Sequence, residues 1–266
     1  MYGVKEFRAE VNGGSVPCIS FGRGSRPLVM IPGLRTASIE GTGGMISAYY
    51  RMFAREYRVW IIDRRDVLPE NPTIGDLAGD TAAVMSSLGI TGADVWGTSQ
   101  GGMIAQYIAI KYPELVGRLV LAVTASRVND TVTDAVNTWI RFIENNDING
   151  FAGDYICRGY SEAYLKKYRL FLPLALKAQK MMPAKRFISL ARACLTVDTY
   201  DELDRIKCPV LVLGGAEDKV VTGEASREIA EKLGCECVIY EGLSHEAYNE
   251  AKDFNRRILD FFTEKQ

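Results

Sequence analysis

The feature that most constrains the fold is an alternation of short apolar runs with longer segments of helical period. Apolar runs of strand length occur at residues 28–31, 59–62, 93–96, 119–123, 210–213 and 237–240. Helical patterns separate or follow them at residues 46–55, 74–88, 100–111, 223–233 and 246–263. Solid apolar runs are typical of parallel strands buried on both faces. Because strands and helices alternate, the sequence predicts an α/β fold: a mostly parallel sheet with helices on both faces.

Two local signals support this division of the chain. Alternating polar and apolar residues at 7–11 and 16–21 are joined by Asn12 and Gly13, and Asn-Gly between such runs predicts a β-hairpin. Thr73 stands before the second helical segment with Asp76 in its first turn, the pattern of a capped helix N-terminus. The chain therefore opens with a hairpin, and its second helix begins next to Thr73.

Residues 127–198 interrupt the alternation. They contain no buried-strand run and are helical in pattern, rich in Tyr, Phe, Leu, Met and Lys. Eleven Lys and Arg against seven Asp and Glu give them a charge of +4, and since the whole chain carries −1, the rest carries about −5. Loops at the carboxyl ends of parallel strands build the sites of such folds. We expect a helical cap or lid at 127–198 and a core of 1–126 and 199–266; the alternative is that these helices simply belong to the core.

Charge and hydropathy argue against several classes of partner. A net charge of −1 and a pI near 6.0 provide no global field that would attract nucleic acid or anionic lipid. The longest apolar runs are far shorter than the ~20 residues of a spanning helix, and the N-terminal residues contain no apolar region of a secretory signal. We expect a cytoplasmic protein with no nucleic-acid or membrane partner. The oligomeric state is left open, and a homo-oligomer is one alternative.

The cysteines and the single histidine argue against a metal site. Six cysteines are scattered along the chain, and Cys235 and Cys237 are the one close pair. A structural metal site would need further ligands at matching spacing, whereas alternate residues of a strand simply point to the same face. We therefore expect reduced thiols, no metal and no other cofactor.

Ser99 is the candidate nucleophile. Residues 97–101 read G-T-S-Q-G, directly after the apolar run that ends at Trp96 and directly before a helical segment. A strand, a sharp turn and a helix are what a nucleophile elbow requires. The string could also be an ordinary Gly-Ser turn, but its position between strand and helix favours the nucleophile.

A serine hydroxyl needs a base, and the chain offers one histidine. His245 follows the last apolar run, where a loop leaves the same sheet edge that presents Ser99. Asp218 follows the preceding run, and a carboxylate there would hold the imidazole in the required tautomer. Its neighbour Glu217 is a rival for that role. Ser99, Asp218 and His245 stand in the order expected of α/β hydrolases.

At these residues the chain resembles the α/β-hydrolase superfamily, of the capped kind found among small esterases, lactonases and carbon–carbon bond hydrolases. The resemblance covers nearly the whole chain. It includes residues 31–34 (I-P-G-L), 63–65 (D-R-R), 97–101, 208–218 and 242–245. It implies a catalytic triad of Ser99, Asp218 and His245.

The resemblance also implies an oxyanion hole made by the backbone N–H groups of Leu34 and Gln100. The chain departs from the pattern of many relatives in two places. Ile31 and Pro32 stand where many have a histidine before the first glycine, which leaves a backbone donor intact. Residues 63–66 (D-R-R-D) lack the glycines of the usual D-x-R-G-x-G turn, which changes the neighbouring pocket wall.

Two residues are candidates for substrate binding. Arg35 follows the expected oxyanion donor and could reach a substrate carboxylate by a bidentate contact, although it could equally be a solvated loop charge. Trp139 is one of several aromatic residues, Tyr155 among them, that a closed cap would place over Ser99. The glycine-rich residues 41–44 are more typical of a flexible rim than of a phosphate cradle, because no lysine follows at Walker spacing.

These observations predict an enzyme with a small-molecule acyl substrate: a serine hydrolase of a carboxylic ester, thioester or lactone that works through an acyl-enzyme. The same residues could cleave a carbon–carbon bond or an amide. A ligand-binding protein that has kept the fold without turnover is the alternative from another class.

Overall fold

The computed structural model describes residues 3–168, 171 and 181–264. Within them eight strands form one sheet in the order β1-β2-β4-β3-β5-β6-β7-β8. β1 pairs with β2, and β2 with β4, in antiparallel fashion, whereas β3 to β8 pair in parallel. The strands are β1 (Lys5–Val11), β2 (Gly14–Phe21), β3 (Arg26–Ile31), β4 (Tyr57–Ile62), β5 (Ala93–Thr98), β6 (Val116–Ala122), β7 (Val210–Gly215) and β8 (Glu236–Tyr240). The predicted mostly parallel α/β fold and its N-terminal hairpin are confirmed.

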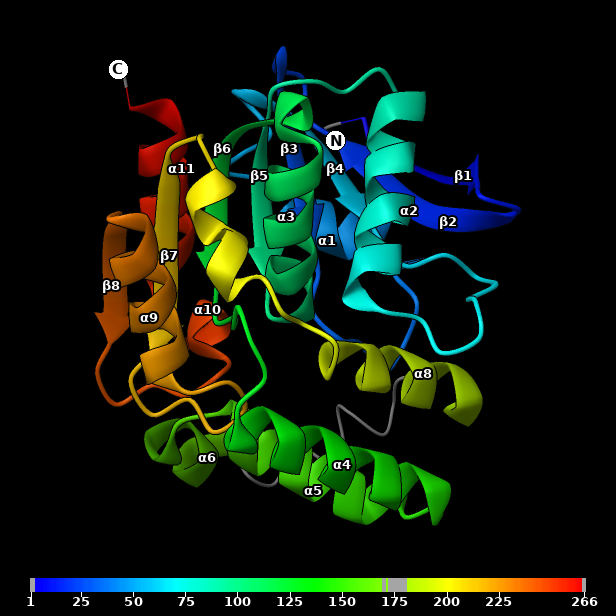
Figure 1. Ribbon diagram of the computed structural model, residues 1–266, viewed down its shortest axis with the longest axis vertical. Coiled ribbons are helices and arrows are strands. Elements are labelled where there is room, and N and C mark those ends of the chain that lie inside the picture. The colour runs from blue at the N-terminus through cyan, green and yellow to red at the C-terminus, as the bar shows by residue number, and fades with distance from the viewer. Residues whose placement is uncertain (1–2, 169–170, 172–180, 265–266) are drawn as a thin grey trace.

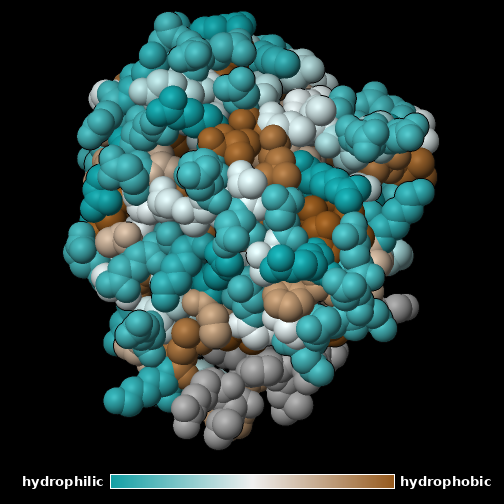
Figure 2. Space-filling model, turned by 60° about the horizontal axis from the view of Figure 1, so that its bottom comes forward, coloured by the Kyte–Doolittle hydropathy of each residue, from teal (hydrophilic) through white to brown (hydrophobic). Residues whose placement is uncertain are grey.

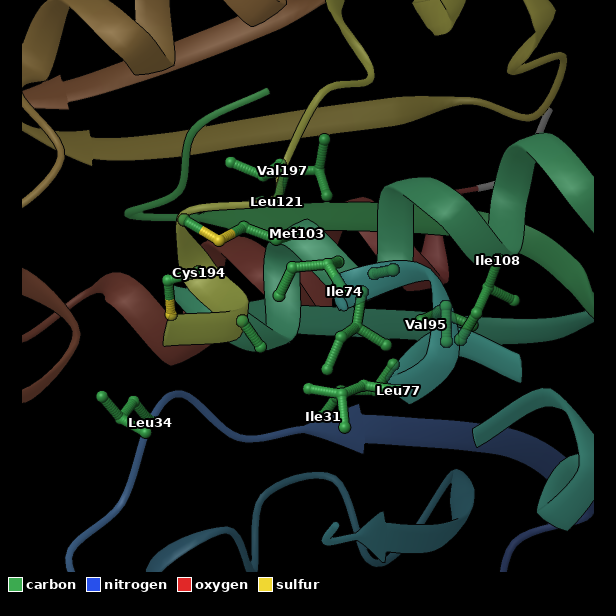
Figure 3. Packing of buried hydrophobic residues seen from close by; sticks show 14 of the residues in the cluster. Ile31, Leu34, Ile74, Leu77, Val95, Met103, Ile108, Leu121, Cys194 and Val197 are labelled. Atoms are coloured by element: carbon green, nitrogen blue, oxygen red, sulfur yellow. The ribbon is translucent and has the colours of Figure 1, made fainter. Parts of the chain in front are cut away.

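The central strands are buried on both faces, as their apolar sequences predict. In β6, Leu119 and Leu121 pack into the cluster on one face, while Val120 and Ala122 pack into the cluster on the other. Figure 3 shows the first cluster, in which side chains of β3, β5 and β6 meet those of the helices in front of the sheet. Two apolar layers therefore pack the sheet between helices.

Helices cover both faces of the sheet (Figure 1). α2 (Ile74–Ser87), α3 (Gln100–Lys111) and α9 (Gly223–Leu233) pack on one face, and α1 (Gly43–Tyr49) and α11 (Phe254–Thr263) on the other. The predicted cap of α2 is present: the Asp76 N–H donates to Thr73 Oγ1 at 3.1 Å and the Thr73 N–H donates to Asp76 Oδ2 at 2.8 Å. Short 3₁₀ helices at Pro113–Leu115 and Tyr200–Arg205 lead toward β6 and β7.

Two predicted helices are wrong in extent. The segment predicted as helix 46–55 forms α1 and then a tighter turn, because Phe53 and Ala54 bond back three residues as the chain enters β4. The segment predicted as one helix over 246–263 is divided into α10 (Ala247–Glu250) and α11, with Ala251 in extended conformation between them. The break lets α10 follow the sheet edge while α11 packs its apolar stripe on the sheet.

The chain between β6 and β7, which we call the helical segment (residues 127–198), lies beyond one end of the sheet (Figure 1). Its described helices are α4 (Asp130–Glu144), α5 (Ile148–Gly159), α6 (Glu162–Tyr168) and α8 (Ala184–Cys194). An antiparallel bridge between Arg127 and Asp198, beside a 2.7 Å bond from the Thr199 N–H to the Ser126 carbonyl, joins its two ends. Residues 169–170 and 172–180 of this predicted cap lie outside the described residues.

The surface at the end of the molecule that carries these helices is mainly hydrophilic. Figure 2 brings this end forward, and its hydrophobic areas are small and separated by polar residues. Among the described residues, no helix is both long enough and apolar enough to cross a bilayer.

Candidate active site

Ser99 occupies the sharp turn between β5 and α3. Its φ of 53° and ψ of −120° lie outside the ordinary allowed regions, as in a strained nucleophile turn. The turn is tight because Gly101 lies against the end of β3: a Cβ at Gly101 would come within 1.9 Å of the Ile31 carbonyl oxygen. The Ser99 N–H donates to the Ala122 carbonyl at 2.8 Å, which fixes the turn to β6. The sequence pattern at 97–101 therefore forms the predicted strand–turn–helix.

Ser99, His245 and Asp218 lie in one hydrogen-bonded line. His245 Nε2 is 2.9 Å from Ser99 Oγ, and His245 Nδ1 is 2.8 Å from Asp218 Oδ2. An ionised carboxylate only accepts hydrogen bonds, so Nδ1 carries the proton and Nε2 is free to accept from the serine hydroxyl. This is the tautomer that a general base for Ser99 requires.

Asp218, rather than its rival Glu217, reaches the imidazole. Asp218 is buried, and its Oδ1 accepts the N–H groups of Val220 at 2.8 Å and Val221 at 2.9 Å. These two bonds orient the carboxylate so that Oδ2 points at His245. Glu217 is exposed. Both lie directly after β7, where the sequence places a carboxylate.

Opposing effects act on the pKa of His245. Burial alone lowers it, but the charge of Asp218, the hydrogen bond to Asp218 and the charge of Glu246 raise it by more, so that the net pKa lies above the ordinary value of 6.5. Glu246 is itself buried, and burial raises the pKa of its carboxyl group. The imidazole therefore stays protonated to a higher pH than a free histidine does.

The two predicted oxyanion donors flank Ser99. Gln100 is the first residue of α3, and the first N–H groups of a helix have no acceptor within the helix. Leu34 follows Gly33, which touches the nucleophile closely: a Cβ at Gly33 would lie 3.2 Å from Ser99 Cβ. The backbone at Gly33 therefore lies against Ser99, and Leu34 and Gln100 stay the expected oxyanion donors.

A cavity of about 400 Å³ adjoins this site. Its wall includes Thr98, next to Ser99, as well as Gly33 and Leu34. Polar side chains and tyrosine rings line much of the rest: Arg35, Tyr50, Tyr155, Tyr160, Glu246 and Tyr248. Tyr155 comes from α5, so the helical segment contributes to the wall. Apolar side chains complete the wall, among them Ile39, Ile46 and Trp96.

Of the two candidate substrate-binding residues, Arg35 lines the cavity and Trp139 does not. Arg35 is half-buried in the cavity wall, where its Nε donates to the Ala37 carbonyl at 3.2 Å. Trp139 is buried within the helical segment instead: its Nε1 donates to Asp154 at 2.9 Å, and its ring packs on Tyr155, 5.2 Å between centroids. Trp139 therefore supports a lining residue from behind, which corrects its expected place beside the substrate.

Sequence reasoning missed Glu246, although its signal was available. It directly follows His245 and begins the turn into α10, so a residue there had to lie near the imidazole. Its burial and its place in the cavity wall depend on tertiary packing with α5. As to metals, the described residues contain no cluster of three or more His, Cys, Asp or Glu side chains that could hold an ion.

Comparisons with known proteins find hydrolases. The family model described as serine aminopeptidase, S33, matches residues 74–252, a span that includes Ser99, Asp218 and His245. A protein of Rhizobium rhizogenes named "Putative carbamate hydrolase RutD" is 24% identical, over 85% of this chain and 90% of its own. The 3-oxoadipate enol-lactonase 2 of Acinetobacter baylyi is also 24% identical, over 80% of each chain.

A solved structure shows the same fold. The α/β-hydrolase enzyme MGS-M2, from a Medee basin deep-sea metagenome library, superposes with a TM-score of 0.86 at 20% identity, over 98% of each chain.

Proposed function

Because this chain belongs to the serine aminopeptidase S33 family of α/β hydrolases and is a hydrolase enzyme, we propose that it hydrolyses a small carboxylic ester, thioester or lactone through an acyl-enzyme. The observation that carries the proposal is the hydrogen-bonded line from Ser99 through His245 to Asp218. An enol-lactonase among the relatives supports the choice of substrate class.

In the proposed mechanism Ser99 Oγ attacks the carbonyl carbon while His245 Nε2 takes its proton. Asp218 stabilises the imidazolium that forms. The negative charge on the carbonyl oxygen is bound by the N–H groups of Leu34 and Gln100. His245 then gives its proton to the leaving group. In the second half, water attacks the acyl carbon while His245 Nε2 takes its proton, and Ser99 Oγ leaves with that proton as the carboxylic acid is released.

In this proposal residues 127–198 act as a cap. Tyr155 and Tyr160 of the helical segment face the cavity beside Thr98, so closing this wall over Ser99 would exclude water from the acyl group. The core of 1–126 and 199–266 then supplies the chemistry, and the helical segment supplies part of the binding surface.

The proposal is tested with matched substrates. We expect turnover of short p-nitrophenyl esters or of a γ-lactone, with rates that fall once the acyl chain exceeds the cavity, and no turnover in Ser99→Ala. The corresponding anilide should be hydrolysed far more slowly. Faster cleavage of the anilide would identify an amide hydrolase, and no Ser99-dependent turnover of any member would contradict the proposal.

The pH profile should depend on Glu246. His245 acts as a base when neutral, so kcat/KM falls as pH decreases through its raised pKa, above 6.5. The charge of Glu246 contributes to that rise, so Glu246→Gln should move the acid limb to lower pH. Glu241→Gln, at an exposed residue four positions before His245, is the control. An acid limb that stays in place or moves upward in Glu246→Gln would refute this role.

Arg35 should favour substrates that carry a carboxylate. We expect kcat/KM for a dicarboxylic half-ester to exceed that for its uncharged counterpart, and added salt to narrow the gap by screening. Arg35→Gln should reduce the preference by about 1–3 kcal/mol, the range of a charge-assisted hydrogen bond. Arg51→Gln, at an exposed arginine after α1, should leave it unchanged. Equal rates for both esters at low salt, unaltered in Arg35→Gln, would make Arg35 a loop charge only.

A further inference from the structure

Arg64 is a buried arginine immediately after β4 that the proposed mechanism does not use. Its exposed fraction is 3%. It stands in the D-R-R-D turn at residues 63–66, where the glycines common among relatives are missing. A long charged side chain rarely fills such a place unless it is hydrogen-bonded there.

The guanidinium of Arg64 connects the two backbone segments that flank Ser99. Its Nη2 donates to the Pro32 carbonyl at 2.5 Å, and its Nε donates to Gln100 Oε1 at 3.2 Å. Pro32 lies two residues before Leu34, and Gln100 is the residue whose own N–H is the second expected oxyanion donor. The planar guanidinium of Arg64 therefore holds the segment that contains Leu34 and the residue Gln100, the two expected oxyanion donors, at a fixed separation.

The opposite side of Gln100 is held by α8. Gln100 Nε2 donates to the Leu190 carbonyl at 2.6 Å and contacts Cys194 Sγ at 3.2 Å. Arg186, at the start of α8, donates through Nη2 to the Arg64 carbonyl at 3.0 Å. The Gln100 side chain has its hydrogen bonds on both sides, so it cannot rotate without breaking one of them.

Arg64 forms no ion pair with a carboxylate among the described side chains, but the charge of the buried Asp63 acts on it and opposes the effect of burial on its pKa. The nearest acid, Asp63, uses its oxygens to accept the backbone N–H groups of Arg64 at 2.9 Å and Ile39 at 3.1 Å. Arg64 Nη1 is buried and finds no hydrogen-bond partner in the described part of the chain. Burial lowers the pKa of the guanidinium to about 10, so the group is charged at neutral pH.

A buried charge without a direct ion-pair partner is costly to keep. Here the guanidinium bonds to the Pro32 carbonyl and to the Gln100 side chain, next to the expected oxyanion donors. A positive charge in low dielectric stabilises an anion that develops nearby. Negative charge that develops on the substrate would offset this cost further. Because that charge is greatest near the transition state, the effect would favour the transition state over the bound substrate.

We propose that Arg64 is a positioning residue of the oxyanion hole: it holds Pro32 and Gln100 at fixed separation and places a positive charge next to the donors at Leu34 and Gln100. The inference rests on the proposed serine mechanism. It predicts that losing Arg64 weakens the binding of the tetrahedral intermediate more than that of the substrate.

The test compares Arg64→Met and Arg64→Lys with Arg65→Met. Arg65 is the adjacent arginine and is mostly buried, but it pairs with Asp80 at 3.0 Å. Within the described part of the chain its side chain forms no hydrogen bond with Pro32 or Gln100. For each folded variant one measures kcat and KM for a p-nitrophenyl ester and the Ki of a boronic acid, which forms a tetrahedral anion on serine.

We expect Arg64→Met to lower kcat by about 100-fold and to weaken the boronic acid in parallel, with KM within about threefold of wild type. Arg64→Lys keeps the charge but not the two-pronged guanidinium, so its kcat should fall about 10-fold. Arg65→Met should keep both the kcat and the boronic acid Ki of the wild type. If Arg64→Met does not fold, Arg64→Lys decides alone. The inference would be overturned if the kcat of Arg64→Met, or of Arg64→Lys where Arg64→Met does not fold, stays within about threefold of wild type. It would also be overturned if Arg65→Met lowers kcat equally.

Ser99→Ala, measured in the same assay, separates this inference from the proposed function. Abolished turnover in Ser99→Ala together with an unaffected Arg64 variant would refute the role of Arg64 alone. Turnover that survives Ser99→Ala would refute the serine mechanism itself, and the role of Arg64 with it.

Discussion

Ser99→Ala should lower kcat on an activated ester by about 10⁶, because Ser99 Oγ is the proposed nucleophile that forms the acyl-enzyme. His245→Ala should be about equally harmful, since Ser99 Oγ then has no base at 2.9 Å. The two residues act as a unit, so the double variant should lose little more than either single one. Steady-state rates of the three purified variants check this directly.

Ser126→Ala is the matched control. Ser126 is buried, and its hydroxyl has no hydrogen-bond partner in the described residues, so removing it should leave kcat near the wild-type value. If His245→Ala keeps more than about a tenth of wild-type turnover, His245 is not the general base.

Asp218→Asn should lower kcat by about 10⁴, less than the loss of Ser99. The substituted amide would keep the shape of the carboxylate but would present an N–H₂ group either to His245 Nδ1 or to the N–H groups of Val220 and Val221. It therefore favours the wrong imidazole tautomer or breaks the bonds that orient the side chain. The same variant should also lower the pKa of His245, because the charge of Asp218 helps to raise it.

Glu217→Gln tests the register of the acid. Glu217 is exposed and precedes Asp218 by one residue, so the exchange should leave kcat nearly unchanged. Greater damage in Glu217→Gln than in Asp218→Asn would mean that the acid is misplaced by one residue.

The fold and the positions of the three aligned side chains could be predicted from the sequence because each lies in the turn or loop that follows a parallel strand. Ser99 follows β5, Asp218 follows β7 and His245 follows β8. The carboxyl ends of parallel strands meet at one sheet edge, so strand position alone brings these side chains to one region. The 2.8 and 2.9 Å distances between their side-chain atoms depend on the conformation of the turns after these strands, which strand position does not predict.

The rest depended on packing between distant elements. Trp139 is aromatic, as many binding residues are. Its hydrogen bond to Asp154 and its packing on Tyr155 place it behind the cavity wall, and neither contact could be predicted from the sequence. The break near Ala251 carries no Gly or Pro to reveal it. From the sequence alone Arg64 looks like a surface charge. Its hydrogen bonds to Pro32 and Gln100 form only because the sheet places the ends of β3, β4 and β5 side by side.

The most direct measurement of the central claim is labelling by a fluorophosphonate probe, which reacts with serines activated by an adjacent base. The serine mechanism predicts one probe per chain, located by peptide mass spectrometry on Ser99, abolished in Ser99→Ala and retained in Ser126→Ala. A probe found on another residue, or an unlabelled wild-type enzyme that still hydrolyses its ester, would contradict it.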